Sequence, residues 1–90
     1  MISEKEKSVI CALAQKYHVK RILLFGSNID PRRKETNDID LAVEGISPKH
    51  FFKFYGDLLF SLRKSVDLVD LSLKSKFTQL VKKEGVLLYG

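Results

Sequence analysis

The segment Asp38-Ile39-Asp40-Leu41-Ala42-Val43-Glu44 is the most informative part of this 90-residue chain. Its charged and apolar side chains alternate almost completely, which is the period of a β-strand with one buried face. Two aspartates at this spacing on a strand point to the same side of the sheet. The segment therefore predicts a strand that buries Ile39, Leu41 and Val43 and presents two carboxylates together.

Two carboxylates side by side on a strand are an unfavourable arrangement, because aspartate is disfavoured in strands and like charges repel. A hard cation removes the repulsion, and Mg²⁺ is commonly held by one or two carboxylates together with substrate phosphates. The simpler interpretation is that Asp38 and Asp40 form the solvated face of an amphipathic strand. The two aspartates alone leave both interpretations open.

A Gly-Ser pair, Gly26-Ser27, precedes this strand and follows the apolar run Arg21–Phe25. Glycine lets a backbone approach phosphates closely, and serine adds a hydroxyl and an N–H group where a helix could start. By itself the pair is an ordinary turn at the end of a strand. In combination with Asp38 and Asp40, it favours a site for a nucleoside triphosphate and a metal ion.

The rest of the chain is divided into helices and strands by its periodicity and its turn residues. Ser3 is a suitable helix N-cap and Gly85 a suitable helix C-cap. The expected elements are helices over about 4–17 and 48–63 and strands at 21–25, 38–44, 66–71 and 86–89, the last at an edge. A further short helix carries Phe77, Leu80 and Val81 and ends at 82–85. This order predicts one α/β (α+β) domain over residues 1–90, with a mixed sheet of about four strands and helices largely on one face.

Composition narrows the class of protein further. Apolar residues make up 44% of the chain and include six Phe and three Tyr, so the chain is expected to be ordered and globular. Cys11 is the single cysteine, which excludes an internal disulfide. The charged N-terminus and the short apolar runs predict a cytoplasmic protein that does not enter a membrane. The net charge of +5 suits a polyanionic partner without identifying it.

Four blocks of the sequence, in order along nearly the whole chain, resemble the minimal nucleotidyltransferase (MNT) family of the DNA polymerase beta-like nucleotidyltransferase superfamily. The blocks are Leu24–Ser27, Asp38–Val43, Val66–Leu71 and Glu84–Tyr89. The resemblance implies a mixed sheet, two Mg²⁺ ions, and transfer of a nucleoside monophosphate from a triphosphate with release of pyrophosphate. It also implies a HEPN-domain toxin as partner, with the MNT protein acting as the MntA-type antitoxin of a toxin–antitoxin pair.

The resemblance assigns roles to particular residues. Asp38, Asp40 and a third aspartate form the expected catalytic and metal-binding set. The third is Asp67 or Asp70, which face opposite sides of their strand, and Asp67 is preferred because it matches the family position. The expected nucleotide-binding residues are Gly26, Ser27, Arg32 and Arg33.

The chain departs from the family pattern shortly after the Gly-Ser pair. The family usually has a basic residue and then a glycine there, whereas this chain has Asp30 and Pro31. Asp30 repels a triphosphate, and either Arg32, Arg33 and Lys34 supply the missing positive charge or these three belong to a solvated loop. The expected function is transfer of AMP from ATP to a hydroxyl group, that of a tyrosine of the HEPN toxin. The alternative is an antitoxin without catalysis, which masks its partner and keeps a vestigial nucleotide site.

The segment 48–63 carries more apolar residues than one buried stripe of a helix can hold. Phe60 in particular falls outside the main stripe. We therefore expect an exposed apolar patch and a homodimer or hetero-oligomer that uses it; the alternative is that the first helix or the last strand covers it. Direct nucleic-acid binding is not expected, because no stripe of aromatic and basic residues is present.

Overall fold

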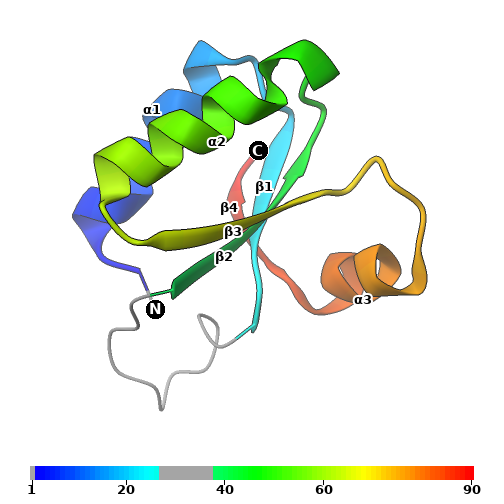
Figure 1. Cartoon of the computed structure of the whole chain (residues 1–90). Helices are drawn as coiled ribbons and strands as arrows, with labels where there is room; N and C mark the ends of the chain where they lie inside the picture. Colours follow the sequence, from blue (N-terminus) through cyan, green and yellow to red (C-terminus); the bar gives the residue numbers. More distant parts are fainter. Residues whose placement is uncertain (1, 27–37) are drawn as a thin grey trace.

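The structure is a computed structural model of the chain that describes residues 2–26 and 38–90. The described elements follow the predicted order (Figure 1). They are α1 (Glu4–Lys16), β1 (Arg21–Leu24), β2 (Asp38–Glu44), α2 (Pro48–Leu62), β3 (Ser65–Asp70), α3 (Lys76–Glu84) and β4 (Val86–Tyr89). The predicted bounds of β2 and β4 are confirmed, and those of the other elements differ by about one residue at one end or at both.

The four strands form one mixed sheet in the order β3-β2-β1-β4. β2 and β3 are parallel, and α2 provides the crossover connection that a parallel pair needs. β1 is antiparallel both to β2 and to β4. The predicted mixed sheet and the edge position of β4 are therefore confirmed.

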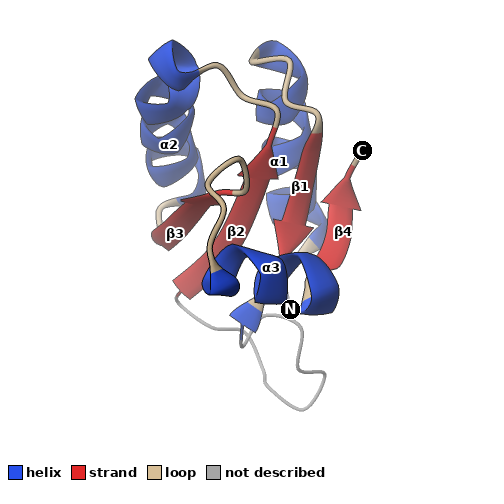
Figure 2. Cartoon of the chain, turned by 90° about the vertical axis from the view of Figure 1, so that its right-hand side faces the viewer, coloured by secondary structure: helices blue, strands red, loops and turns tan. Residues whose placement is uncertain are grey.

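The two faces of the sheet are covered unequally (Figure 2). α1 and α2 pack on one face, where the largest fully buried side chains include Ile10, Ile39, Leu41, Phe54 and Leu58. α3 lies on the other face, which has a smaller core of Leu23, Ala42, Leu71 and Val81. The prediction of helices largely on one face is confirmed, with α3 as the exception.

The two predicted helix caps, Ser3 and Gly85, are both confirmed. The Ser3 hydroxyl accepts a hydrogen bond from the Glu6 N–H at 3.1 Å, and the Ser3 N–H donates to the Glu6 carboxylate at 2.9 Å. This reciprocal pair is a capping box, so the predicted N-cap is confirmed. Gly85 is the C-cap of α3, as predicted, and its backbone is extended rather than left-handed. Its small size matters instead, because a Cβ there would lie 2.6 Å from the Val81 carbonyl oxygen.

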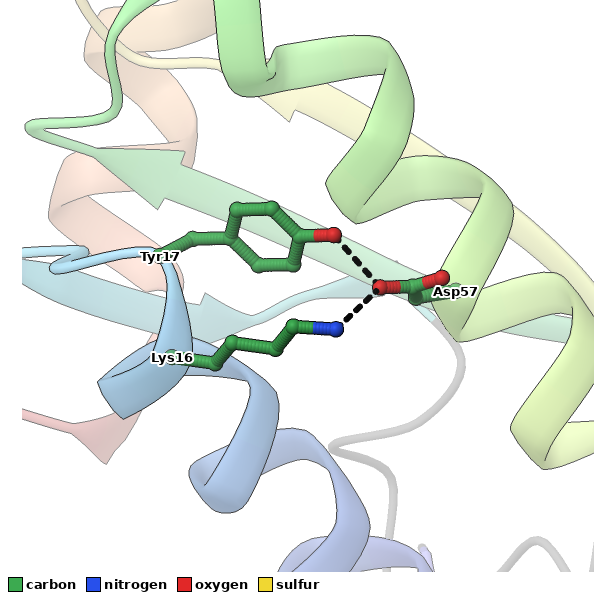
Figure 3. A network of polar contacts seen from close by, with 3 residues as sticks. All are labelled: Lys16, Tyr17 and Asp57. Atoms are coloured by element: carbon green, nitrogen blue, oxygen red, sulfur yellow. Dashed lines mark hydrogen bonds and ion pairs between the residues drawn. The ribbon is translucent and has the colours of Figure 1, made fainter.

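A polar contact joins the two long helices on their outer side (Figure 3). The Tyr17 hydroxyl at the end of α1 donates to Oδ2 of Asp57 in α2 at 2.5 Å, and Lys16 Nζ lies 3.4 Å from the same oxygen. The hydrogen bond from Tyr17 is the main cause that lowers the pKa of Asp57, and Lys16 adds to it. The ionised form of Asp57 is therefore part of what holds α1 against α2.

The outer side of α2 is apolar and exposed, as predicted. Phe52 is 78% exposed, Phe60 83% and Leu59 42%. A seven- or eight-residue spacing places these three side chains on one side of the helix, and we call them the outer face of α2. The alternative that α1 or β4 covers them is wrong. No helix in residues 2–26 and 38–90 is long and apolar enough to cross a membrane.

Candidate active site

The aspartates of β2 lie on the face of the sheet that carries α3. Ile39, Leu41 and Val43 point into the core beneath α1 and α2, so the alternating side chains point the other way. Asp38 is exposed and Asp40 is half-buried. The two predicted carboxylates therefore share one face, and Asp40 is more enclosed than a fully solvated surface residue.

The parallel register between β2 and β3 adds Asp67 to this face. Asp67 is the direct strand partner of Asp40. The two side chains lie within hydrogen-bonding reach of each other, and the negative charge of Asp38 also acts on Asp40. The structure thus places the three aspartates that the sequence resemblance selected on one face of the sheet, with Asp40 and Asp67 in contact.

Asp70 lies apart from this group. It is three residues after Asp67 on the same strand, so its side chain emerges on the opposite face. Its Oδ1 accepts a hydrogen bond from the Ser72 N–H at 2.9 Å, and it lines a hollow together with Pro48 and Phe51. Asp70 therefore stabilises the turn that follows β3.

Gly26 lies beside Asp40, shortly after the end of the neighbouring strand β1. The Phe25 N–H donates to the Asp40 carbonyl oxygen at 3.1 Å, which fixes the chain beside β2. The next residue, Gly26, has a φ of +69°, and a Cβ at this position would lie 2.6 Å from Asp40 Oδ2. Glycine is therefore required here both by its backbone angle and by the space that the Asp40 carboxylate occupies.

The electrostatics of the group favour a bound cation. Burial, the negative charge of Asp67, hydrogen bonding to Asp67 and the charge of Asp38 together raise the pKa of Asp40. Like-charged carboxylates in a partly buried position raise one another's pKa unless a cation neutralises them. The donor set is all oxygen, which fits Mg²⁺. Among the described residues, no three acidic, histidine or cysteine side chains already converge on one point as metal ligands, so Asp38 would have to move toward the Asp40–Asp67 pair.

Part of the predicted nucleotide site lies outside the described residues. Ser27, Arg32 and Arg33 fall in the segment 27–37, as do Asp30 and Pro31 of the altered motif. Gly26 is the predicted nucleotide-binding residue that the structure places, directly against Asp40.

Sequence reasoning missed one feature beside the aspartates. A cavity of about 300 Å³ lies between the end of β1 and α3, and Gly26 forms part of its wall. The sequence pattern assigns Phe77, Leu80 and Val81 only to a short helix and not to a cavity. A signal was available, because Phe25 shares a sheet face with Leu23 by the two-residue period of a strand.

A comparison with protein families matches residues 7–90 to the family described as polymerase beta, nucleotidyltransferase. The chain belongs to this family. The resemblance drawn from the four sequence blocks is thereby confirmed. The match also includes the segments that carry Gly26 and the three aspartates of this nucleotidyltransferase domain.

Individual relatives agree with the family. A protein of Methanocaldococcus jannaschii, named as a candidate protein adenylyltransferase, is 42% identical over 43 residues, which are 48% of this chain and 50% of that protein. The domain therefore spans about half the length of this relative.

Two solved structures resemble the domain over nearly all of its length. One is a toxin–antitoxin complex with AMP-PNP, in which the matching chain is 29% identical with a TM-score of 0.75, over 93% of this chain and 73% of that chain. The other is a complex of a tri-AMPylated Shewanella oneidensis HEPN toxin with an MNT antitoxin, with 27% identity and a TM-score of 0.75, over 99% of this chain and 73% of that chain. The domain thus shares its fold and family with chains of HEPN–MNT complexes.

The raised pKa of Asp40 makes a prediction about stability. Its folded-state pKa lies above that of the unfolded chain, so the folded state binds the proton more tightly. Stability is then lost as the pH rises from the ordinary aspartate pKa, about 3.9, through the higher folded value. We expect Asp40→Asn to be more stable than the wild type at pH 7 without divalent metal, and the difference to shrink near pH 4.

Urea unfolding at the two pH values measures this difference. The matched control is Asp57→Asn, because the pKa of Asp57 is lowered, chiefly by the Tyr17 hydroxyl. Its stabilising effect is present at pH 7 and is lost as the pH falls through the folded pKa, so this variant should be less stable than the wild type at pH 7. If Asp40→Asn also lowers stability at pH 7, carboxylate repulsion does not govern the site.

Proposed function

We propose that this domain transfers the AMP unit of ATP to a hydroxyl group of a partner protein. The observation that carries the proposal is the Asp40–Asp67 pair, with Asp38 on the same sheet face and Gly26 against Asp40. Membership of the nucleotidyltransferase family supports the class of reaction. The choice of ATP follows the relative solved with AMP-PNP and the relative named as a candidate adenylyltransferase.

In the proposed reaction the acceptor hydroxyl oxygen attacks the α-phosphorus of ATP. The bond from the α-phosphorus to the oxygen that bridges to the β-phosphate breaks, and pyrophosphate leaves with the electron pair. Asp67 accepts the hydroxyl proton. Gly26 admits the β- and γ-phosphates close to the backbone, with Ser27, Arg32 and Arg33 as further proposed contacts.

The carboxylates of Asp38, Asp40 and Asp67 would hold Mg²⁺. Two such ions, when bound, stabilise the charges on the attacking and the leaving oxygen. The raised pKa of Asp40 means that this carboxylate gains more from a neighbouring cation than a solvated aspartate does. The chain's own contribution is to keep the three carboxylates on one rigid sheet face.

We propose a tyrosine of a HEPN-domain toxin as the acceptor, so that the domain acts as an antitoxin. The proposal rests on the solved relative, which is a complex of an AMPylated HEPN toxin with an MNT antitoxin. The second candidate is an antitoxin that masks its partner without catalysis. Asp30 and Pro31 favour this candidate, because they replace a basic residue and a glycine of the family pattern.

Both candidates need a docking surface for the partner, and we propose the outer face of α2 (Phe52, Leu59 and Phe60). Two of these side chains are more than three-quarters exposed. Burial of one such side chain is worth roughly 1.5–3 kcal/mol, so an apolar surface of this kind commonly marks a protein contact.

One experiment separates the two candidates. The domain is mixed with the HEPN-domain protein of its own genome, Mg²⁺, and ATP labelled at either the α- or the γ-phosphate. We expect the α-label to reach the partner, whereas transfer of the γ-label alone indicates a kinase and contradicts the mechanism. A tight complex without transfer of either label identifies the masking antitoxin.

The same mixture tests the docking surface. Phe60→Ser should weaken the complex in sedimentation without lowering the stability of the domain, because Phe60 is 83% exposed. The matched control is Leu87→Ser on β4, which is 53% exposed and lies away from α2. If Phe60→Ser and Leu87→Ser bind the partner equally well, the outer face of α2 is not the docking surface.

A further inference from the structure

The cavity beside Gly26 has a definite composition. Its wall consists of Phe25, Gly26, Phe77, Leu80, Val81 and Glu84, and we call it the α3 pocket. The rings of Phe25 and Phe77 meet edge to face, with centroids 5.9 Å apart. Phe77 is 50% exposed and Leu80 is 49% exposed, so the pocket presents apolar surface to solvent.

The α3 pocket continues the candidate active site. Gly26 forms part of the pocket wall, and the space above its Cα is occupied by the Asp40 carboxylate. The pocket and the aspartates lie on the same face of the sheet, since Phe25 and Val81 belong to the small core beneath α3. A molecule that contacts Gly26 with its phosphates therefore has this pocket directly beside it.

The chemistry of the pocket suits a ring rather than a phosphate. Apart from Gly26, its described lining is apolar or aromatic except for Glu84, and none of these residues is positively charged. A volume of about 300 Å³ is at the lower end of ligand pockets, roughly 300–1,000 Å³. It fits one flat heterocycle better than a whole nucleotide.

We propose that the α3 pocket binds the base of the nucleoside triphosphate, with Phe77 and Leu80 as its main contacts. The inference rests on the proposed function, because it requires a triphosphate at Gly26 and the aspartates. The base of that nucleotide is joined through the ribose to the α-phosphate, so a nucleotide whose phosphates contact Gly26 can place its base in the neighbouring pocket. Glu84 disfavours phosphate in the pocket and thereby sets the direction in which the nucleotide enters.

The competing occupant is the aromatic ring of the acceptor tyrosine. Both rings suit an apolar pocket, but the acceptor must approach the α-phosphorus from the side opposite the leaving pyrophosphate. The pocket shares its wall with Gly26, which is on the side of the phosphates in the proposed mechanism. This side is opposite to the approaching acceptor, so the acceptor ring is disfavoured, and the base reaches the pocket when the ribose folds back over the phosphates.

The test compares ATP with magnesium tripolyphosphate, which has the phosphates and lacks the base. Affinities for both are measured by calorimetry for the wild type and for Leu80→Ser. The variant should bind ATP about five- to tenfold more weakly, because apolar contact with the base is lost, and tripolyphosphate as the wild type does. Phe77→Leu provides a second variant that removes the ring and keeps an apolar side chain.

Leu87→Ser is the matched control, since Leu87 is similarly exposed and does not line the pocket. Thermal unfolding confirms that each variant is folded. The base site is overturned if Leu80→Ser binds ATP with the same affinity as the wild type. It is also overturned if the affinities for ATP and for tripolyphosphate fall by the same factor. If Leu80→Ser slows transfer to the partner with unchanged ATP affinity, the pocket belongs to the acceptor. Absence of ATP binding by the wild type removes the proposed function together with this inference.

Discussion

Asp67→Asn is expected to reduce the rate of AMP transfer about a thousandfold, whereas Asp70→Asn should leave the rate within about threefold. A metal ion supplies several kcal/mol of transition-state stabilisation, and each 1.4 kcal/mol is a factor of ten in rate. Asp67 is the strand partner of Asp40 on the face with α3. Asp70 emerges on the other face and accepts the Ser72 N–H.

The two substitutions are closely matched. Both exchange a carboxylate for an amide on β3, and the asparagine at position 70 keeps an oxygen that accepts the Ser72 N–H. Initial rates of α-label transfer, at saturating ATP and Mg²⁺, give the comparison. A large loss in Asp70→Asn together with a small loss in Asp67→Asn would mean that the catalytic group is on the opposite face of the sheet.

Gly26→Ala is expected to weaken Mg²⁺-dependent ATP binding by roughly 10–100-fold, the usual cost of disturbing the support of a metal ligand. The new Cβ would meet Asp40 Oδ2 at 2.6 Å, and the carboxylate must turn away. The positive φ of Gly26 adds about 1–2 kcal/mol of strain for a residue with a Cβ. Calorimetry gives the affinity, and urea unfolding gives the stability.

Gly56→Ala is the control for this variant. Gly56 lies inside α2, and a Cβ there meets nothing within 4 Å. Alanine in a helix interior should stabilise the domain by about 0.5–1 kcal/mol, with no change in ATP affinity. If Gly26→Ala binds ATP as well as Gly56→Ala does, Gly26 does not shape the nucleotide site.

Local patterns were enough to predict the elements and the placement of Asp38 and Asp40 on one face of a strand. The two-residue alternation of Asp38–Glu44 fixed both ends of β2, and Ser3 with Glu6 marked the start of α1. The excess of apolar residues in α2 correctly indicated exposed side chains such as Phe60. Each of these features depends on residues within a few positions of one another.

The features that sequence reasoning left open depend on residues far apart in the chain. The resemblance favoured Asp67 over Asp70, but the pairing of Asp67 with Asp40 depends on the register of β3 against β2, which no local pattern determines. The α3 pocket brings Phe25 and Phe77 together across fifty residues and was not predicted. The extended backbone of Gly85 also departs from the usual left-handed helix end, because β4 begins at once. The roles of Ser27, Arg32 and Arg33 stay predictions.

The central claim is that Asp38, Asp40 and Asp67 on one sheet face bind ATP through Mg²⁺. Calorimetry tests this claim most directly. ATP is titrated into the wild type with and without Mg²⁺, and into Asp38→Asn combined with Asp40→Asn, with thermal unfolding as the check of folding. We predict a saturable heat for the wild type in Mg²⁺, and none without the metal or in the double variant. Indistinguishable heats under all these conditions would contradict the account.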